Sequence, residues 1–148
     1  MTLRGPDAEL ARLVARFEHA AYGGLKRAVI SRGAGTLAEM IRQGFDESRK
    51  PTGGAWRRLK HPRARNRPNR GGPLCDSGAL RREASTVQIT PDGWLITVDA
   101  PGAAAHLYGA PAIGLPARPF LPIDRLPAAW RRRMALEAAQ TLRQELGP

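Results

Sequence analysis

The apolar residues near the start of the chain recur at intervals of three and four positions, which is the spacing of one face of an α-helix. Asp7 precedes this stripe and can cap the helix. A second stripe ends at Phe45, so we expect residues 7–48 to be helical and both stripes to pack in a core. The first stripe is Leu10, Leu13, Val14 and Phe17, and the second is Leu37, Met40, Ile41 and Phe45.

Glycines separate the two stripes. Gly23-Gly24 weakens the helical pattern, which resumes briefly at Leu25 and Val29. The sequence Ser-Arg-Gly-Ala-Gly at residues 31–35 then predicts an outright break, because glycine is a poor helix former.

The chain on both sides of Pro91-Asp92-Gly93, a turn signal, alternates between apolar and polar residues. This alternation predicts an antiparallel hairpin with one covered face, and we expect residues 74–110 to be mainly β. With helices before and after it, the hairpin predicts an α+β fold, in which a small antiparallel sheet packs against N-terminal and C-terminal helices. The apolar set is Val87, Ile89, Trp94, Ile96 and Val98, and the polar set is Thr86, Gln88, Thr90, Thr97 and Asp99.

The region 111–126 is rich in proline and includes the sequence Gly-Leu-Pro-Ala-Arg-Pro-Phe-Leu-Pro. Proline restricts the backbone, so we expect a stiff loop that loses little entropy when it docks. In one interpretation Phe120 is buried and Arg118 bonds locally or across a subunit boundary. In the other, Phe120 fills the core of its own chain while the prolines position the last helix. Both interpretations can hold together.

The last predicted helix spans residues 127–146. Pro127 suits a first helical turn, and Gly147-Pro148 ends the helix. Its inner face is expected to be Trp130, Met134, Ala138, Thr141 and Leu142, and its outer face Arg131, Arg132, Arg143 and Gln144.

Residues 49–73 have a different composition, with nine Lys or Arg and no acidic residue. Self-repulsion and the Pro/Gly content predict a mobile basic loop. Trp56 and Leu59 are its large apolar residues and are expected to anchor its start in the core. Three interpretations of the charge stay open: a solvated loop, contact with an acidic protein neighbour, and contact with DNA.

The composition bounds the function further. The 148 residues suit a single domain, 1–148, and the formal net charge of +11 favours an acidic partner. Cys75 is the only cysteine, which excludes an intramolecular disulfide. No secretory signal and no membrane-length apolar segment is recognised, so we expect a cytoplasmic protein.

No arrangement of residues predicts catalysis. His19, His61 and His106 are dispersed, and no H-E-x-x-H or C-x-x-C spacing indicates a metal site. Cys75 with His106 is a weak candidate for a nucleophile and its base, since nearly any chain holds one such pair. The sequence therefore predicts a protein that is not an enzyme and has no metal or cofactor.

Four segments, in order, resemble the phage virion-morphogenesis family. The first, residues 45–59, ends a helix at Phe45 and continues through Pro51, Gly53, Gly54, Trp56 and Leu59. After the basic loop, Leu-Cys-Asp-Ser-Gly-Ala-Leu-Arg at 74–81 resembles the family's L-x-D-[ST]-G-x-L-R segment. His106 and Gly109 fit an A-x-x-H-x-x-G segment, and residues 115–121 resemble I-P-A-R-P-F-L with Leu in place of Ile.

The resemblance implies a structural component of a tailed-phage virion. Its members include tail-completion and head–tail joining proteins, so this chain is expected at the neck or tail end of the virion, after assembly in the host cytoplasm. We expect a ring of identical subunits that helps to join head to tail, with self and neighbouring neck and tail proteins as partners. The isolated chain is expected to be monomeric or weakly associated, because its sparse aromatic residues predict no large apolar interface.

The candidate residues fall into two groups. Ser77 or Asp76 is expected to cap a short helix or tight turn, with Gly78 tolerating an unusual backbone angle and Leu80 pointing inward. Candidate partner contacts are Arg57, Arg58, Lys60, Arg63, Arg65, Arg67, Arg70, Arg81, Arg118 and Phe120. Candidate structural residues of the family segments are Trp56, Asp76, Ser77, Gly78, Leu80, His106, Gly109, Pro116 and Pro119.

The alternative function is a non-enzymatic, cytoplasmic nucleic-acid-binding protein that acts through its Arg-rich loop. Arginines that neutralise phosphates bind DNA without sequence preference. Against this reading, Trp56 is the only aromatic ring in the basic run, which is poor support for base stacking.

Overall fold

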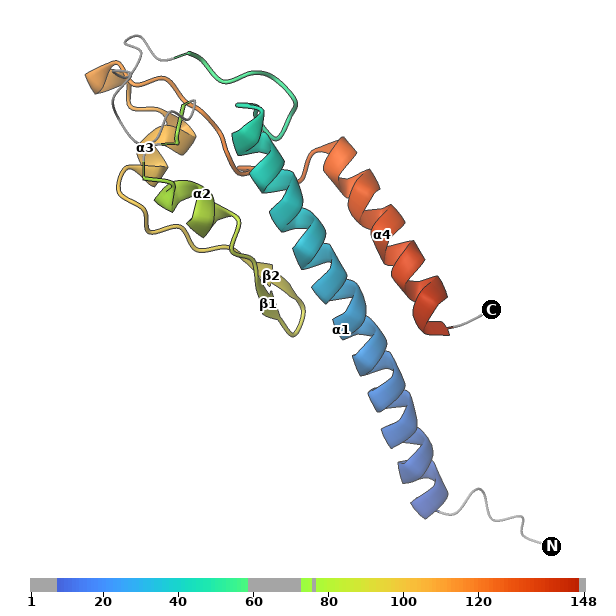
Figure 1. Ribbon diagram of the computed structural model, residues 1–148. Helices are drawn as coiled ribbons and strands as arrows, with labels where there is room; N and C mark the ends of the chain where they lie inside the picture. The colour runs from blue at the N-terminus through green and yellow to red at the C-terminus, as the bar shows by residue number, and fades with distance from the viewer. Residues whose placement is uncertain (1–7, 59–72, 76, 147–148) are drawn as a thin grey trace, which may run out of the picture.

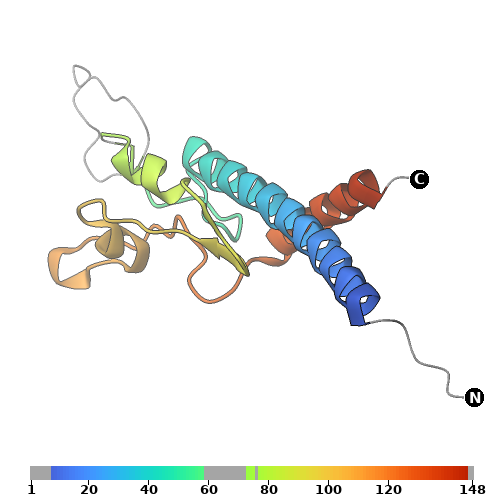
Figure 2. The ribbon, with the colours of Figure 1, turned by 90° about the horizontal axis from the view of Figure 1, so that it is seen from below.

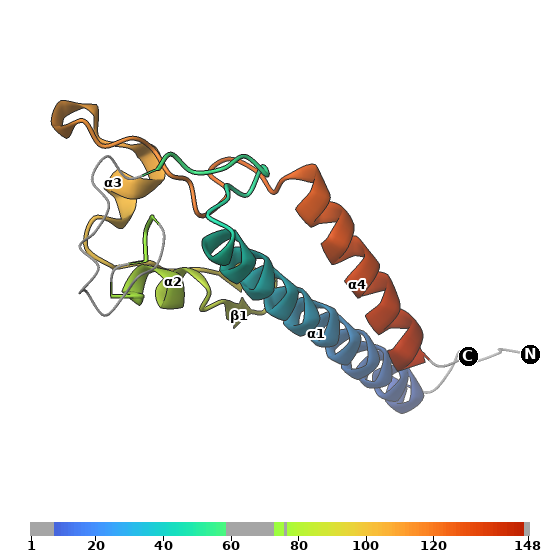
Figure 3. The ribbon, with the colours of Figure 1, turned by 45° about the horizontal axis from the view of Figure 1, so that its top comes forward.

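One long helix organises the chain, as the computed structural model in Figure 1 shows. The structure describes residues 8–58, 73–75 and 77–146, with the backbone alone for residues 8–21. Helix α1 (Ala8–Asp46) runs the length of the molecule, and α4 (Ala128–Leu146) packs along one side of it. The opposite side carries the small elements (Figures 2 and 3): α2 (Ala79–Ala84), β1 (Gln88–Thr90), β2 (Gly93–Leu95), α3 (Ala103–Tyr108) and the 3₁₀ turn η1 (Pro111–Ile113).

The α+β expectation is confirmed, but the predicted break at residues 31–35 is wrong. Helix α1 continues through both glycine-containing stretches. A Cβ added to Gly33 would lie 2.7 Å from Cζ2 of Trp94, so the glycine is needed for close approach of the indole. The Trp94 Nε1–H also donates a hydrogen bond of 2.7 Å to the carbonyl of Ile30. Packing against the hairpin therefore outweighs the poor helix propensity of glycine.

The turn at Pro91-Asp92 is confirmed as the tip of an antiparallel hairpin. Thr90 pairs with Gly93 and Ile89 with Trp94. The expectation that residues 74–110 are mainly β is wrong, because each strand has three residues and two short helices flank the hairpin. Helix α2 follows the left-handed Gly78, and α3 follows the left-handed Gly102 and is rich in alanine, the best helix former.

The covered face of the hairpin is incomplete. Ile96 and Val98 pack against the core as expected, while Thr97 and Asp99 are exposed. Ile89 remains 49% exposed, although its alternation predicts a covered position. The sheet has only two strands, so no third strand of the described chain extends it.

The core lies at the C-terminal end of α1. All four residues of the second predicted stripe are buried, and Phe45 and Ile41 are the largest side chains that are fully enclosed. In α4, Met134 and Thr141 are buried, the other three predicted inner positions are half-buried, and the predicted outer residues are exposed. The helical periodicity therefore identified both inner faces.

A matched pair of glycine substitutions tests the packing of Trp94. Gly33→Ala is expected to lower the free energy of unfolding by about 1–3 kcal/mol, because the added Cβ overlaps the indole. Gly35→Ala, whose Cβ would meet no atom within 4 Å, is expected to raise it by up to about 1 kcal/mol. Urea unfolding followed by circular dichroism measures both. Stabilisation by both substitutions would contradict the position of Trp94.

Candidate functional site

The proline-rich loop is held in place by hydrogen bonds to two other parts of the chain, His106 and residues 56–58. The backbone N–H of Arg118 donates to the carbonyl of His106 at 2.7 Å. The Nε of the Arg118 side chain donates to the carbonyl of Arg57 at 2.9 Å, and its Nη2 donates a longer bond of 3.4 Å to the carbonyl of Arg58. The indole N–H of Trp56 donates to the carbonyl of Pro119 at 2.8 Å. We call residues 116–120 with 56–58 the clamp.

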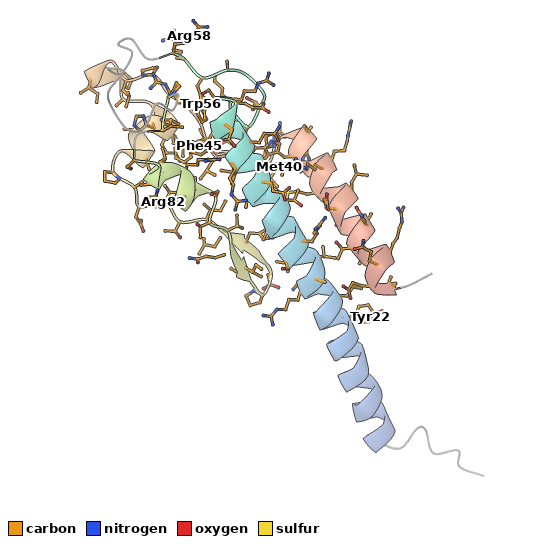
Figure 4. All side chains as sticks on the ribbon, in the orientation of Figure 1. Tyr22, Met40, Phe45, Trp56, Arg58 and Arg82 are labelled. Carbon is orange, nitrogen blue, oxygen red and sulfur yellow. The ribbon has the colours of Figure 1, made fainter. Side chains whose placement is uncertain are left out.

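An aromatic cluster lies directly under the clamp. Phe45 at the end of α1 meets the ring of Trp56 edge-on at 5.4 Å and the ring of Phe120 at 5.8 Å. Figure 4 shows Phe45 and Trp56 side by side at this end of the helix. Phe120 is 3% exposed, as expected of a residue that fills the core of its own chain. The cluster fixes the loop on the C-terminal end of α1.

Arg118 is also only 3% exposed. Burial lowers the pKa of its guanidinium, and its hydrogen-bond partners are main-chain carbonyls rather than carboxylates. Arg118 and Phe120 were candidate partner contacts, with local bonding of Arg118 and burial of Phe120 kept as open interpretations, and in the structure both are enclosed by their own chain. Their side chains shape the clamp and do not present a surface to a neighbour.

His106 lies beside this buried arginine. Its Nδ1 is buried and has no hydrogen-bond partner within the described residues. Desolvation by burial, and secondly the charge of Arg118, lower the pKa of His106 below its ordinary value of 6.5. The ring is therefore held in its neutral form. At Gly109, φ is +84° and an added Cβ would lie 3.0 Å from the Ala117 nitrogen, so the backbone passes close to the clamp there.

The neutral form of His106 predicts a pH dependence of stability. Because its pKa is lower in the folded chain than in the unfolded chain, the unfolded chain binds the proton first as the pH falls. Stability is then fully present above about pH 6.5 and declines as the pH falls from there through the folded-state pKa. Urea unfolding at pH 7.5, 6.5 and 5.5 measures this decline, which His106→Gln is expected to reduce. An equal decline in the variant would assign it to other groups.

The segment predicted to cap a short helix precedes α2, but the N-cap residue is Gly78, which makes no side-chain cap hydrogen bond. The Ser77 hydroxyl accepts a hydrogen bond of 3.2 Å from the Ala79 N–H, and Gly78 adopts φ of +75°. Leu80 packs against the core. Arg81 makes an ion pair of 2.7 Å with Asp46, the last residue of α1, and so ties α2 to the end of the long helix.

Two arginines of the basic loop belong to the clamp. Arg57 and Arg58 are exposed, and Arg58 lies at the outer end of the molecule (Figure 4). Pro116 and Pro119 are half-buried within the clamp. The described residues do not include the remaining candidate residues, so the mobility expected of residues 60–72 stays a prediction. These candidates are Lys60, Arg63, Arg65, Arg67, Arg70 and Asp76.

A groove of about 930 Å³, which sequence reasoning missed, lies between the C-terminal end of α1 and the N-terminal end of α4. Its apolar lining includes Met40, Leu121, Ile123, Leu126 and Trp130. Two stretches that are distant in the sequence build it, namely the end of α1 with the turn at 47–53, and the loop at 119–127 with the start of α4. No local signal in the sequence marks such a surface.

Charged residues surround this apolar floor, five of them cationic and two acidic. Arg49 pairs with Glu47 at 3.5 Å, and Arg133 pairs with Glu39 at 3.1 Å. Within the described part of the chain, no ion pair occupies the remaining three cations, which are Lys50, Arg125 and Arg131. The groove is therefore apolar inside and positively charged at its rim.

The described residues hold no group of three or more His, Cys, Asp or Glu side chains that could bind a metal ion. Over the same residues, no helix is both long enough and apolar enough to cross a membrane. The features that the structure does offer are a rigid clamp, an adjacent basic segment and an open groove.

Comparisons with known proteins identify the family of this chain. No curated protein and no solved structure matches the chain. A family model described as the phage virion morphogenesis family matches residues 7–145, which is nearly the whole chain and includes α1, the clamp and α4. The four segments that carried the resemblance all lie within this match. The protein belongs to the phage virion morphogenesis family and acts in the assembly of phage particles.

Proposed function

We propose that this protein is a neck or tail-completion component of a tailed phage, which assembles as a ring and helps to join head to tail. The observation that carries the proposal is the family match over residues 7–145, which includes every element that the structure describes. The role is structural and not enzymatic. Its partners are other copies of itself and the neighbouring proteins of the neck and tail.

The clamp supports a joining role on physical grounds. A segment held by main-chain hydrogen bonds and an aromatic cluster keeps its shape before it meets a partner, so docking orders few additional groups. It also fixes where the basic loop leaves the body at Arg57 and Arg58. Exposed positive charge on a rigid base favours fast and oriented encounter with an acidic neighbour.

Deletion of the gene from the phage, with the protein supplied from a plasmid as the control, tests the proposal. We expect the deletion to give DNA-filled heads and separate tails in electron micrographs, and the plasmid to restore whole particles. Whole, infective particles without the protein would overturn the proposal. Loss of DNA packaging with normal joining would favour the alternative of a nucleic-acid-binding protein.

A further inference from the structure

The N-terminal part of α1 extends beyond the rest of the described chain. Arg32 pairs with Glu137 and Glu39 with Arg133, so α1 and α4 run antiparallel. Helix α4 ends at Leu146, nine residues after Glu137. Because the helices are antiparallel, nine residues before Arg32 brings α1 to residue 23, so α4 can pack against α1 only to about that residue. Figure 1 shows α1 continuing past both α4 and the hairpin, and Tyr22, near the end of α4 in Figure 4, is 71% exposed. We call residues 8–23 the arm.

The arm has the sequence of a docking helix. At 100° per residue, its four apolar positions centre about 150° around the axis from the stripe that ends at Phe45. The apolar side of the arm is therefore not the side on which α1 meets its own core. A helix of this length is marginal in water on its own, since nucleation is costly and packing supplies most helix stability. The four positions are Leu10, Leu13, Val14 and Phe17.

The charges of the arm complement those of the groove. By the same helical count, Glu9 and Glu18 border the apolar stripe on its two sides. Arg12 and His19 fall on the opposite face, with Arg16 between them and Glu9. An apolar stripe bordered by two carboxylates matches a groove with an apolar floor and a cationic rim.

We propose that the arm of one copy docks in the groove of the next copy. The arm lies at one end of α1 and the groove at the other, so the contact is heterologous, and a rotation that closes makes a ring. The inference rests on the proposed ring and supplies its interface. The two docking elements come from opposite ends of a helix about 58 Å long, which excludes docking of an arm in its own groove.

Disulfide trapping tests this contact directly. In a Cys75→Ser background, one preparation carries Leu13→Cys in the arm and another carries Ile123→Cys in the groove. Oxidation of the mixture, in concentrated solution and in assembled particles, is expected to link the two variants. The matched control replaces Leu13→Cys with His19→Cys on the opposite face of the arm. We expect the first pair to link about tenfold more than the control, a difference equivalent to about 1.4 kcal/mol.

Equal linking of the two pairs, or linking of Leu13→Cys to itself alone, would overturn the arm-to-groove contact. A functional test separates this failure from that of the proposed function. Leu13→Asp with Phe17→Asp is expected to abolish complementation of the gene deletion, whereas Arg12→Asp with His19→Asp is expected to retain it. Complementation by the first variant refutes the docking proposal and leaves the joining role intact. Loss of complementation without any trapping refutes it as well, because the arm would then meet a different protein.

Discussion

Phe120→Ala is expected to lower the free energy of unfolding by about 3–5 kcal/mol. The ring is 3% exposed and contacts Phe45, the residue around which the core is arranged. Its removal leaves a cavity between α1 and the clamp, and the neighbouring prolines limit how far the loop can collapse into it. A domain of this size is stabilised by only about 5–15 kcal/mol in total, so the variant should unfold at far lower urea concentration.

Two further substitutions calibrate this result. Phe120→Leu keeps an apolar side chain and is expected to cost less than Phe120→Ala, by at least about 1 kcal/mol. Ile113→Ala removes a side chain that is 77% exposed and is expected to change stability by less than about 0.5 kcal/mol. If Phe120→Ala behaved like Ile113→Ala, the aromatic cluster would not be the core that the structure describes.

Removal of the central charges of the basic loop is expected to block the joining of heads to tails. The variant replaces Arg63, Arg65, Arg67 and Arg70 with Ser and takes the formal net charge from +11 to +7. Folding should be retained, because solvated charges contribute little to stability. A charge-assisted hydrogen bond contributes about 1.5–3 kcal/mol, so loss of several is expected to weaken contact with an acidic neighbour by roughly 1,000-fold or more. Plaque yield and electron micrographs measure the result.

The control for this variant has the same net charge. Replacing Arg27, Arg42, Arg132 and Arg143 with Ser removes four exposed arginines from the helices and should leave plaque yield within about tenfold of the parent. Whole particles that lose DNA would assign the loop to DNA contact, and a shallower salt dependence of DNA binding in vitro would accompany that result. Full infectivity of the loop variant would leave the charges as a solvated surface.

Short sequence patterns predicted the features that are determined by residues close together in the sequence. The Pro91-Asp92 turn, the start of α2 at Ser77-Gly78 and the inner face of α4 all follow from short patterns. Both interpretations of the proline-rich loop had Phe120 buried, which is confirmed. These features need no knowledge of which distant segments meet.

Features that depend on distant contacts were missed or misread. The break expected in α1 came from glycines, and the structure uses one of them, Gly33, for close contact with Trp94. The side chain of Arg118 reaches carbonyls about 60 positions away, and the groove is built by two stretches that are distant in the sequence. A single sequence does not show which distant segments lie together in the folded chain.

The partners of Arg118 have a consequence for how this surface evolves. Its guanidinium binds the main-chain carbonyls of Arg57 and Arg58 and makes no measured bond to their side chains. Any amino acid at those two positions offers the same carbonyls. Substitutions there can therefore change the charge and shape presented to another protein without loosening the loop beneath. A phage lineage can thus adapt this surface to a diverging neighbour by single substitutions while the clamp keeps its geometry.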